Sequence, residues 1–120
     1  MARVIIIDDN DTMREGMAVT LKKSGHQVLA FRSGPEGLAA YEKSPVDVVV
    51  TDLKMETLDG IEVVRRLKAF DPNAVALVVT AFGTIEVAVD AMKHGAADFL
   101  TKPFTPDVLR AKVSAALELS

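Results

Sequence analysis

The stretch Val46 to Met55, VDVVVTDLKM, is the part of the sequence that decides the fold. Its β-branched apolar run, Val48 to Val50, predicts a short strand buried on both faces, as in a parallel sheet covered by helices on each side. In open sheets of that kind, ligands bind beyond the carboxyl ends of the strands, and Asp52 occupies that position. We therefore take Asp52 as the first candidate functional residue.

The composition indicates one globular domain, spanning residues 1–120. Of these 120 residues, 49% are hydrophobic and 26% are charged, which suits a chain that buries a substantial core. The absence of cysteine excludes a disulfide framework, a thiolate metal site and a thiol nucleophile, and it suits a reducing compartment. The net charge of -3 gives no general reason to bind nucleic acid or anionic lipid.

No stretch has the pattern of a signal peptide or a membrane span. Only Val4 to Ile7 separate Arg3 from Asp8, which is too short for a secretion signal. No apolar run approaches the roughly 18 residues that a membrane helix requires. We expect a soluble, cytoplasmic protein in which this domain binds neither membranes nor nucleic acid directly.

Strand and helix patterns alternate along the whole chain. Strands are predicted at Arg3 to Ile7, Gln27 to Phe31, Asp47 to Thr51, Ala74 to Val79 and Ala97 to Leu100. Each is followed by a helical pattern, so units of about 20 to 25 residues predict an α/β fold with right-handed crossovers. The second strand ends without an acid, which fits an edge strand. We expect one doubly wound parallel sheet in the order 2-1-3-4-5, flavodoxin-like, with five helices on both faces.

Local signals mark the ends of the helices. Asp11 is predicted to cap the first helix, and the S-x-x-E pattern from Ser33 to Glu36 predicts the start of the second. Gly25 and Gly95 are the predicted helix stops.

The helix predicted from Thr84 to His94 is more apolar than a surface helix requires. The expected inward stripe comprises Ile85, Ala88, Val89 and Met92, and Val87 and Ala91 lie on a further face. Surplus apolar surface of this kind predicts contact with a partner.

Polar residues follow four of the predicted strands. Asp8 and Asp9 follow the first, Asp52 the third, Thr80 the fourth and Lys102 the fifth. Carboxylates held close together repel unless they recruit a cation, and a small oxygen-lined cavity favours Mg²⁺. Lys102 and the Thr80 hydroxyl can hold the oxygens of a transferring phosphoryl group, while Asp52 attacks phosphorus and becomes an acyl phosphate.

These motifs together resemble a known family, the receiver domains of two-component response regulators, with the CheY-like fold. The resemblance extends over the whole chain, through the segments VIIIDDND, VVVTDLKM, DGIEVVRRLK, VVTAFGTIE and DFLTKPF. The segments TDLKM, TAFGTIEVAV and ADFLTKPF look most like the NtrC-type regulators, which control a sigma54-activating ATPase and a DNA-binding domain.

The resemblance assigns a role to each residue of the predicted site. It implies that Asp8, Asp9, Asp52 and the backbone carbonyl of Lys54 hold Mg²⁺, and that Asp52 accepts a phosphoryl group from a sensor histidine kinase. On this basis the domain is a phosphoacceptor switch, with self-catalysed phosphotransfer and dephosphorylation, and is not otherwise an enzyme.

The resemblance also implies how the signal leaves the site. Thr80 and Lys102 would sense the phosphoryl group, Phe99 would occupy the aromatic switch position, and Lys102-Pro103 would be a cis peptide. We expect residues 84–94 and the strand at 97–101 to form the output face, which would bind a partner receiver or a C-terminal effector domain and so control transcription.

One position departs from the family pattern. The family usually has proline after the loop methionine, whereas this chain has Met55-Glu56, which predicts a looser loop with an added carboxylate. A flavodoxin-like FMN site is disfavoured by the acidic first loop. A phosphohydrolase of the haloacid dehalogenase type needs a second aspartate where Lys54 stands. The full set of site residues disfavours a pseudo-receiver, a binding module that never turns over phosphate. Two alternatives stay open: a complete single-domain regulator and the N-terminal domain of a longer transcription factor.

Overall fold

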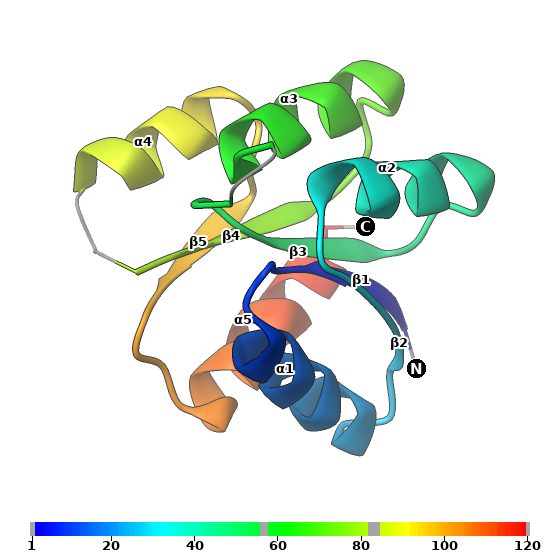
Figure 1. Ribbon diagram of the computed structural model, residues 1–120, viewed down its shortest axis with the longest axis vertical. Coiled ribbons are helices and arrows are strands. Elements are labelled where there is room, and N and C mark those ends of the chain that lie inside the picture. The colour runs from blue at the N-terminus through cyan, green and yellow to red at the C-terminus, as the bar shows by residue number, and fades with distance from the viewer. Residues whose placement is uncertain (1, 56–57, 82–84, 120) are drawn as a thin grey trace.

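The computed structural model describes residues 2–55, 58–81 and 85–119 of the chain. Within these residues, five strands alternate with five helices (Figure 1). They are β1 (Arg3–Ile7), α1 (Asp11–Lys23), β2 (Gln27–Phe31), α2 (Gly34–Lys43), β3 (Val48–Asp52), α3 (Gly60–Phe70), β4 (Ala76–Thr80), α4 (Ile85–Lys93), β5 (Asp98–Thr101) and α5 (Pro106–Leu117). None of the described helices is long and apolar enough to cross a membrane.

The strands form one parallel sheet in the order β2-β1-β3-β4-β5, which confirms the predicted fold class. The register pairs Ile7 of β1 with Thr51 of β3, so the next residues, Asp8 and Asp52, stand level at the edge of the sheet. The topology therefore places the acidic end of β1 beside the acidic end of β3.

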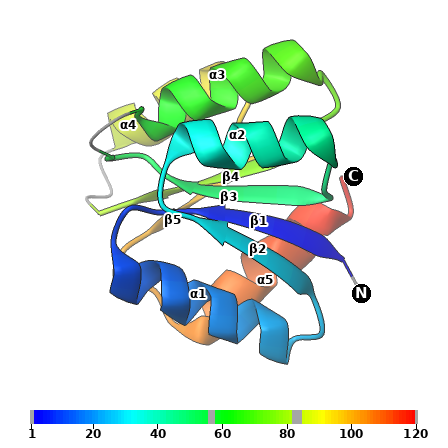
Figure 2. The same ribbon diagram turned by 45° about the vertical axis from the view of Figure 1, so that its right-hand side comes forward.

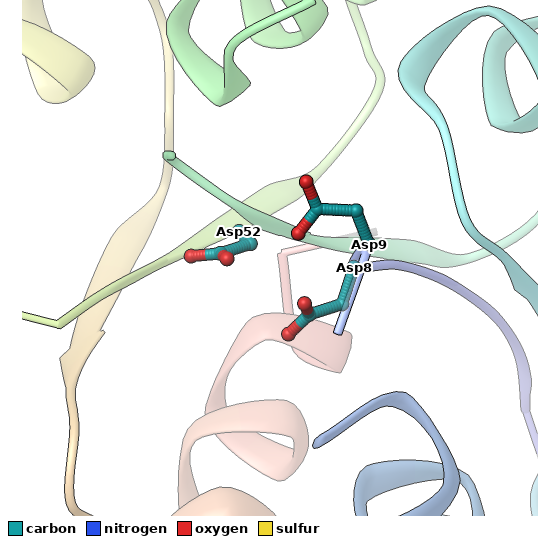
Figure 3. A group of neighbouring side chains, drawn as sticks. All are labelled: Asp8, Asp9 and Asp52. Carbon is teal, nitrogen blue, oxygen red and sulfur yellow. The ribbon is translucent and has the colours of Figure 1, made fainter. Parts of the chain in front are cut away.

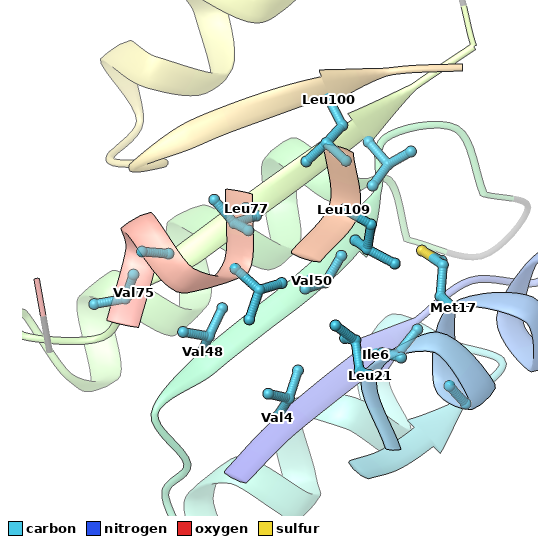
Figure 4. Packing of buried hydrophobic residues seen from close by; sticks show 14 residues of the cluster. Val4, Ile6, Met17, Leu21, Val48, Val50, Val75, Leu77, Leu100 and Leu109 are labelled. Carbon is cyan, nitrogen blue, oxygen red and sulfur yellow. The ribbon is translucent and has the colours of Figure 1, made fainter. Parts of the chain in front are cut away.

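The sheet is the middle layer of three. Helices α1 and α5 cover one face, and α2, α3 and α4 cover the other (Figures 1 and 2). Because successive strand side chains point to opposite faces, each central strand supplies both cores. On the α1 and α5 face the buried cluster includes Val4, Ile6, Met17, Leu21, Val48, Val50, Leu77, Leu100 and Leu109 (Figure 4). On the other face it includes Ile5, Ile7, Tyr41, Val49, Val63, Leu67, Val78 and Ala91.

The first helix is capped by Asn10, so the prediction for Asp11 was wrong. Asn10 is extended, with φ -85° and ψ 116°, and its side chain accepts a hydrogen bond from the Met13 N–H. Asp11 is already the first helical residue, and its carboxylate pairs with Arg14 and Arg32 instead. Two adjacent residues can both act as caps, and the path of the chain leaving β1 decides between them.

The other predicted helix ends are confirmed. The Ser33 hydroxyl accepts from the Glu36 N–H at 3.3 Å, as expected of the cap residue, and it also donates to the Glu36 carboxylate at 2.9 Å. Gly25 and Gly95 have φ values of 91° and 110°, in the left-handed region that favours glycine after a helix.

Helix α4 presents a different face to the sheet from the one predicted. Ala88 and Ala91 are buried, while Val87, Val89 and Met92 are among the exposed large apolar side chains. The predicted inward position of Ala88 is therefore confirmed, and those of Val89 and Met92 were wrong. Ala91, which was predicted on a further face, is buried instead. The helix packs through these two small residues, Ala88 and Ala91, and Val87, Val89 and Met92 remain on the surface. The predicted inward side chain of Ile85 lies outside the described residues.

Strands β3 and β4 each end one residue later than predicted, at a candidate site residue. Asp52 is paired with Val79 and ends β3, and Thr80 is paired with Thr101 and ends β4. Both candidate residues are therefore held by the strand ladder and do not belong to the loops.

Candidate functional site

Three aspartates gather where β1 and β3 end. These are Asp8, Asp9 and Asp52. Each contributes one carboxylate oxygen to a group of three oxygens that lie within 4.8 Å of one another. Figure 3 shows Asp8 and Asp9 at the end of β1 beside Asp52 at the end of β3. The register of the two strands brings together residues that are more than forty positions apart in the sequence.

The carboxylates of Asp8 and Asp52 are ionisable groups held out of water. Asp8 is 0% exposed and Asp52 is 5% exposed. Burial is the main cause that raises the pKa of Asp8, and the Asp9 charge adds to it, against the Asn10 N–H and the Lys102 ammonium. Burial likewise raises the pKa of Asp52, with the Asp8 charge as the next cause. Both carboxylates therefore carry a cost when charged, which a bound cation would relieve.

Lys102 reaches the same point from β5. Its Nζ donates to Oδ2 of Asp52 at 3.4 Å and lies 3.6 Å from Oδ2 of Asp8. The peptide between Lys102 and Pro103 is cis, as predicted. Side chains two residues apart along a strand point to the same face of the sheet. The residues two positions before Asp8, Asp52 and Lys102 all belong to the core under α1 and α5, so the three site residues point to that face.

The donor set fits a hard divalent cation. Among buried side-chain atoms in the described part of the chain, Asp8 Oδ2 is the one that makes no hydrogen bond. The Lys102 ammonium lies 3.6 Å from this oxygen, too far for a hydrogen bond, so a directly bound cation would further relieve the cost of its burial. Oxygen donors at this spacing match the preference of Mg²⁺, which retains several waters when it binds to few carboxylates.

Thr80 and Phe99 lie on the opposite face of the sheet from Lys102. Thr80 is buried at the end of β4, two residues beyond Val78 of the α2, α3 and α4 core, and Phe99 packs against that core. The register pairs Val78 with Phe99 and Thr80 with Thr101, so Thr80 and Phe99 are diagonal neighbours on one face. They connect the site to the side of the sheet that α4 covers.

The sequence of most of the chain matches a known family that has an acidic site at this edge of the sheet. The model of the response regulator receiver domain matches residues 4–114. The chain belongs to this family. Receiver domains are the phosphoryl-accepting domains of two-component response regulators, and the predicted function class is therefore confirmed.

The receiver domain is similar to parts of longer proteins. It is 38% identical over 106 residues to the C4-dicarboxylate transport transcriptional regulatory protein DctD of Rhizobium meliloti, covering 88% of this chain and 23% of that protein. It is 38% identical over 114 residues to the transcriptional regulatory protein FixJ of Bradyrhizobium diazoefficiens, covering 95% of this chain and 56% of that protein. The chain thus spans about a quarter of the first relative and just over half of the second.

A solved structure agrees with the receiver fold. The crystal structure of the receiver domain of NtrX from Brucella abortus matches with a TM-score of 0.93 at 30% identity, covering 98% of this chain and 99% of that one. This likeness supports the expected kinship with NtrC-type regulators.

Two features of the loop after β3, the Lys54 carbonyl ligand and the effect of Glu56, stay predictions. The Lys54 backbone donates a hydrogen bond to the Asp52 carboxylate, and the role of its carbonyl as a metal ligand stays a prediction. Glu56, where the family usually has proline, lies outside the described residues.

The sequence analysis missed two residues that shape the receiver site. Gly60 begins α3 against the strand end, where a Cβ atom would lie only 2.3 Å from the Asp52 carbonyl oxygen, and its N–H donates to the Leu53 carbonyl at 2.9 Å. Arg14 donates from Nη1 to the Asp8 carbonyl at 2.9 Å. The available signals were the Asp59-Gly60 pair at a helix start and an arginine three residues after Asp11.

Proposed function

We propose that this receiver domain accepts a phosphoryl group on Asp52 from a histidine kinase, with Mg²⁺ held by Asp8, Asp9 and Asp52. The observation that carries the proposal is the meeting of these carboxylates within 4.8 Å, with the Lys102 ammonium 3.4 Å from Asp52. The Lys54 carbonyl is assigned as a further ligand because Lys54 lies two residues after Asp52 in the loop, at the position that the receiver family uses for this purpose. We assign residues 1–120 as a single receiver unit.

The chemistry is a transfer of phosphorus between two nucleophiles. An oxygen of Asp52 forms a bond to phosphorus while the bond from phosphorus to the donor histidine nitrogen breaks, and that nitrogen keeps the electron pair. With its other ring nitrogen protonated, the histidine leaves as a neutral imidazole and Asp52 becomes an acyl phosphate. Bound Mg²⁺ supplies neutralisation of the charge on the phosphoryl oxygens. Lys102, already beside Asp52, holds one of these oxygens as the transfer proceeds. The Thr80 hydroxyl holds another.

The same residues support slow loss of the phosphoryl group. Water attacks the acyl phosphate at phosphorus, and the Asp52 carboxylate leaves with the electron pair of the broken bond. The domain hydrolyses its own phosphorylated form, so it acts as a switch with self-catalysed phosphotransfer and dephosphorylation.

A groove next to the site supports docking of the kinase. It runs between α1 and the start of α5, and it is lined by Thr12, Met13, Gly16, Met17, Thr20, Phe104, Pro106 and Leu109. Thr12 and Phe104 are close in sequence to Asp9 and Lys102, so a helix bound along this groove would carry a phosphohistidine to Asp52.

The proposed output runs through Thr80 and Phe99 to α4. When the Thr80 hydroxyl moves towards the phosphoryl group, space opens on its face of the sheet, where Phe99 is the diagonal neighbour. Phe99 enters that space, and α4 repositions with β5. The exposed side chains Val87, Val89 and Met92 then bind a second receiver or an effector domain that controls transcription.

Intact mass spectrometry tests the acceptor. With Mg²⁺ and acetyl phosphate as a small donor, the wild-type chain takes up one phosphoryl group and Asp52→Asn takes up none. Asp107→Asn, which removes a highly exposed carboxylate from α5, is the matched control and is phosphorylated like the wild type. Equal uptake by wild type and Asp52→Asn would contradict the assignment, and no uptake by either would favour a pseudo-receiver.

Backbone amide shifts test the output path. Beryllofluoride mimics a phosphoryl group, and its addition with Mg²⁺ should shift amides in α4 and β5 as well as those next to Asp8, Asp52 and Lys102. Asp52→Asn provides the control, because it removes the attachment point. Shifts confined to the strand ends, with residues 85–101 unchanged, would mean that the signal leaves by another route.

A further inference from the structure

Helices α1 and α5 begin with the same pair of residues. Asp11 and Asp107 lie in the first turns, and each pairs with an arginine three positions later, Arg14 or Arg110. The two arginines differ in their surroundings. The side chain of Arg14 is 16% exposed, whereas that of Arg110 is 39% exposed. An ion pair that stabilises only the start of a helix does not require a buried arginine. The burial of Arg14 therefore indicates that its side chain makes a further contact.

The additional contact of Arg14 is with the backbone of the acidic site. Its Nη1 donates to the carbonyl oxygen of Asp8 at 2.9 Å, while its Nη2 pairs with the Asp11 carboxylate. The Asp11 carboxylate also lies 3.3 Å from Nη2 of Arg32, just beyond β2. The planar guanidinium can hold both oxygens at once because its donors have a fixed fork geometry. Arg110 instead donates to the Ser24 hydroxyl at 3.2 Å, within the α1 and α5 layer.

The Asp8 carbonyl belongs to the peptide that joins Asp8 to Asp9. Fixing its oxygen fixes the plane of that peptide, and with it the direction in which the Asp9 side chain leaves the chain. The turn is also held by the Asn10 N–H, which donates to the Asp8 carboxylate at 2.9 Å, and by the Arg14 N–H, which donates to the Asn10 carbonyl at 2.9 Å. Arg14 therefore closes the loop through both its backbone and its side chain.

We propose that Arg14 is the positioning residue of the acidic pair, holding the Asp8–Asp9 peptide in the orientation that binds a divalent cation. The inference rests on the proposed magnesium site. It assigns Arg14 no contact with the metal or the phosphoryl group, because its guanidinium binds the carbonyl and the Asp11 carboxylate. The effect on the metal passes through the geometry of Asp8 and Asp9.

The charge of Arg14 allows a test by sign. A cationic group close to a metal site weakens cation binding, so removal of a mere neighbouring charge would tighten it. Loss of a positioning contact has the opposite effect, because the carboxylates then sample orientations that do not bind. Arg14→Gln separates the two effects, and Arg14→Lys keeps the charge but loses the fork.

The experiment is a Mg²⁺ titration followed by backbone amide shifts, on the wild type, Arg14→Lys, Arg14→Gln and the matched controls Arg110→Lys and Arg110→Gln. Both Arg14 variants should raise the half-saturating Mg²⁺ concentration by about tenfold, the lower end of what loss of a supporting contact costs a metal site. The Arg110 variants should change it by less than about twofold, since exposed pairs contribute little. Thermal melting of each variant verifies that it is folded.

Phosphorylation by acetyl phosphate gives a second readout. In Arg14→Lys, the Mg²⁺ concentration for half-maximal rate should rise by about the same tenfold factor, while the rate at saturating Mg²⁺ returns close to that of the wild type. A variant that merely lost stability would show a lower melting temperature with an unchanged Mg²⁺ midpoint.

The failures are distinguishable. Tighter or unchanged Mg²⁺ binding by Arg14→Gln, with normal binding by the wild type, would overturn the role of Arg14 and leave the proposed function intact. A wild type that shows no saturable Mg²⁺ binding would overturn the metal site, and the inference with it.

Discussion

The centre of the sheet and its β5 edge are built differently. Every residue of β3 and β4 is buried, whereas in β5 only Leu100 is. The helices differ in the same way, since α3 buries Val63, Val64 and Leu67 and exposes Phe70 only at its last residue, whereas α4 exposes Val87, Val89 and Met92 along its length. The acidic site lies at the tightly packed centre, and the proposed output lies at the edge, where a small free-energy difference can move a helix.

The centre and the edge of the sheet suit different roles. Carboxylates that repel one another must be held by a framework that does not yield, and the buried ladder of β1 and β3 provides it. A switch requires an element with two arrangements of similar free energy, which a fully buried strand does not offer. The predictions below test how sharp this division is.

The largest expected effect is at the centre, at Gly60. Gly60→Ala places a Cβ atom against the Asp52 carbonyl, so the free energy of unfolding should fall by about 3 kcal/mol as strand end and helix separate. Gly16→Ala is the control, because nothing lies within 4 Å of its added Cβ atom, and it should stabilise α1 by about 0.5–1 kcal/mol. Urea unfolding of both variants measures this. Equal effects would mean that the centre is no more rigid than a surface helix.

The next largest effect is expected from relieving the repulsion among the carboxylates at the centre. Asp9→Asn should raise the free energy of unfolding without metal by about 1 kcal/mol, because it removes the Asp9 charge that repels the buried Asp8 carboxylate in a partly solvated site. It should also weaken Mg²⁺ binding by about tenfold through loss of a ligand. Melting with and without Mg²⁺ tests both, with Asp107→Asn as the control carboxylate. A lower metal-free melting temperature in Asp9→Asn would contradict the repulsion argument.

The pH dependence of stability should show the same strain. Because the pKa values of Asp8 and Asp52 are raised by burial, the folded chain binds more protons than the unfolded chain between the ordinary carboxyl pKa and the raised values. The metal-free contribution of these groups to stability is therefore greatest at low pH and falls as pH rises through the raised pKa values.

Subtracting the pH profile of Asp52→Asn from that of the wild type isolates the Asp52 contribution. Saturating Mg²⁺ should reverse its sign, since the cation favours the charged carboxylates. A difference profile that rises with pH in the absence of metal would show that Lys102 outweighs burial at this site.

The smallest expected effect is at the edge. Val89, which is 43% exposed on α4, should be replaceable by alanine at a cost below about 0.5 kcal/mol. Val64→Ala in α3, at a buried position, should cost about 2 kcal/mol. If urea unfolding gives similar losses for the two variants, α4 is packed as firmly as α3 and the contrast between centre and edge fails.

Much of the fold could be predicted because its signals are local. Apolar runs of strand length, helix caps and glycine stops mark the elements, and the acid-free end of β2 indicated its place at the edge of the sheet. The site could be predicted in outline for a related reason. In a parallel sheet all strands end at one edge, so Asp8, Asp52 and Lys102 had to approach one another once their strands were recognised.

The errors lie where two local signals competed. Asn10 and Asp11 are both good helix caps, and only the direction in which the chain leaves β1 selects Asn10. Helix α4 has apolar residues on several faces, and the sequence pattern favoured the larger ones as the buried set. Close packing keeps the predicted Ala88 inward but selects Ala91 in place of Val89 and Met92.

The sequence by itself determined the order of the elements, the parallel sheet and the chemical nature of its acidic edge, because these follow from periodicity and from the residue types at strand ends. The tertiary structure alone decided that Arg14 binds the Asp8 carbonyl and that Gly60 lies against Asp52. Such contacts depend on the distance between a helix start and a strand end. That distance is set by how the layers pack, and no local pattern of residues encodes it.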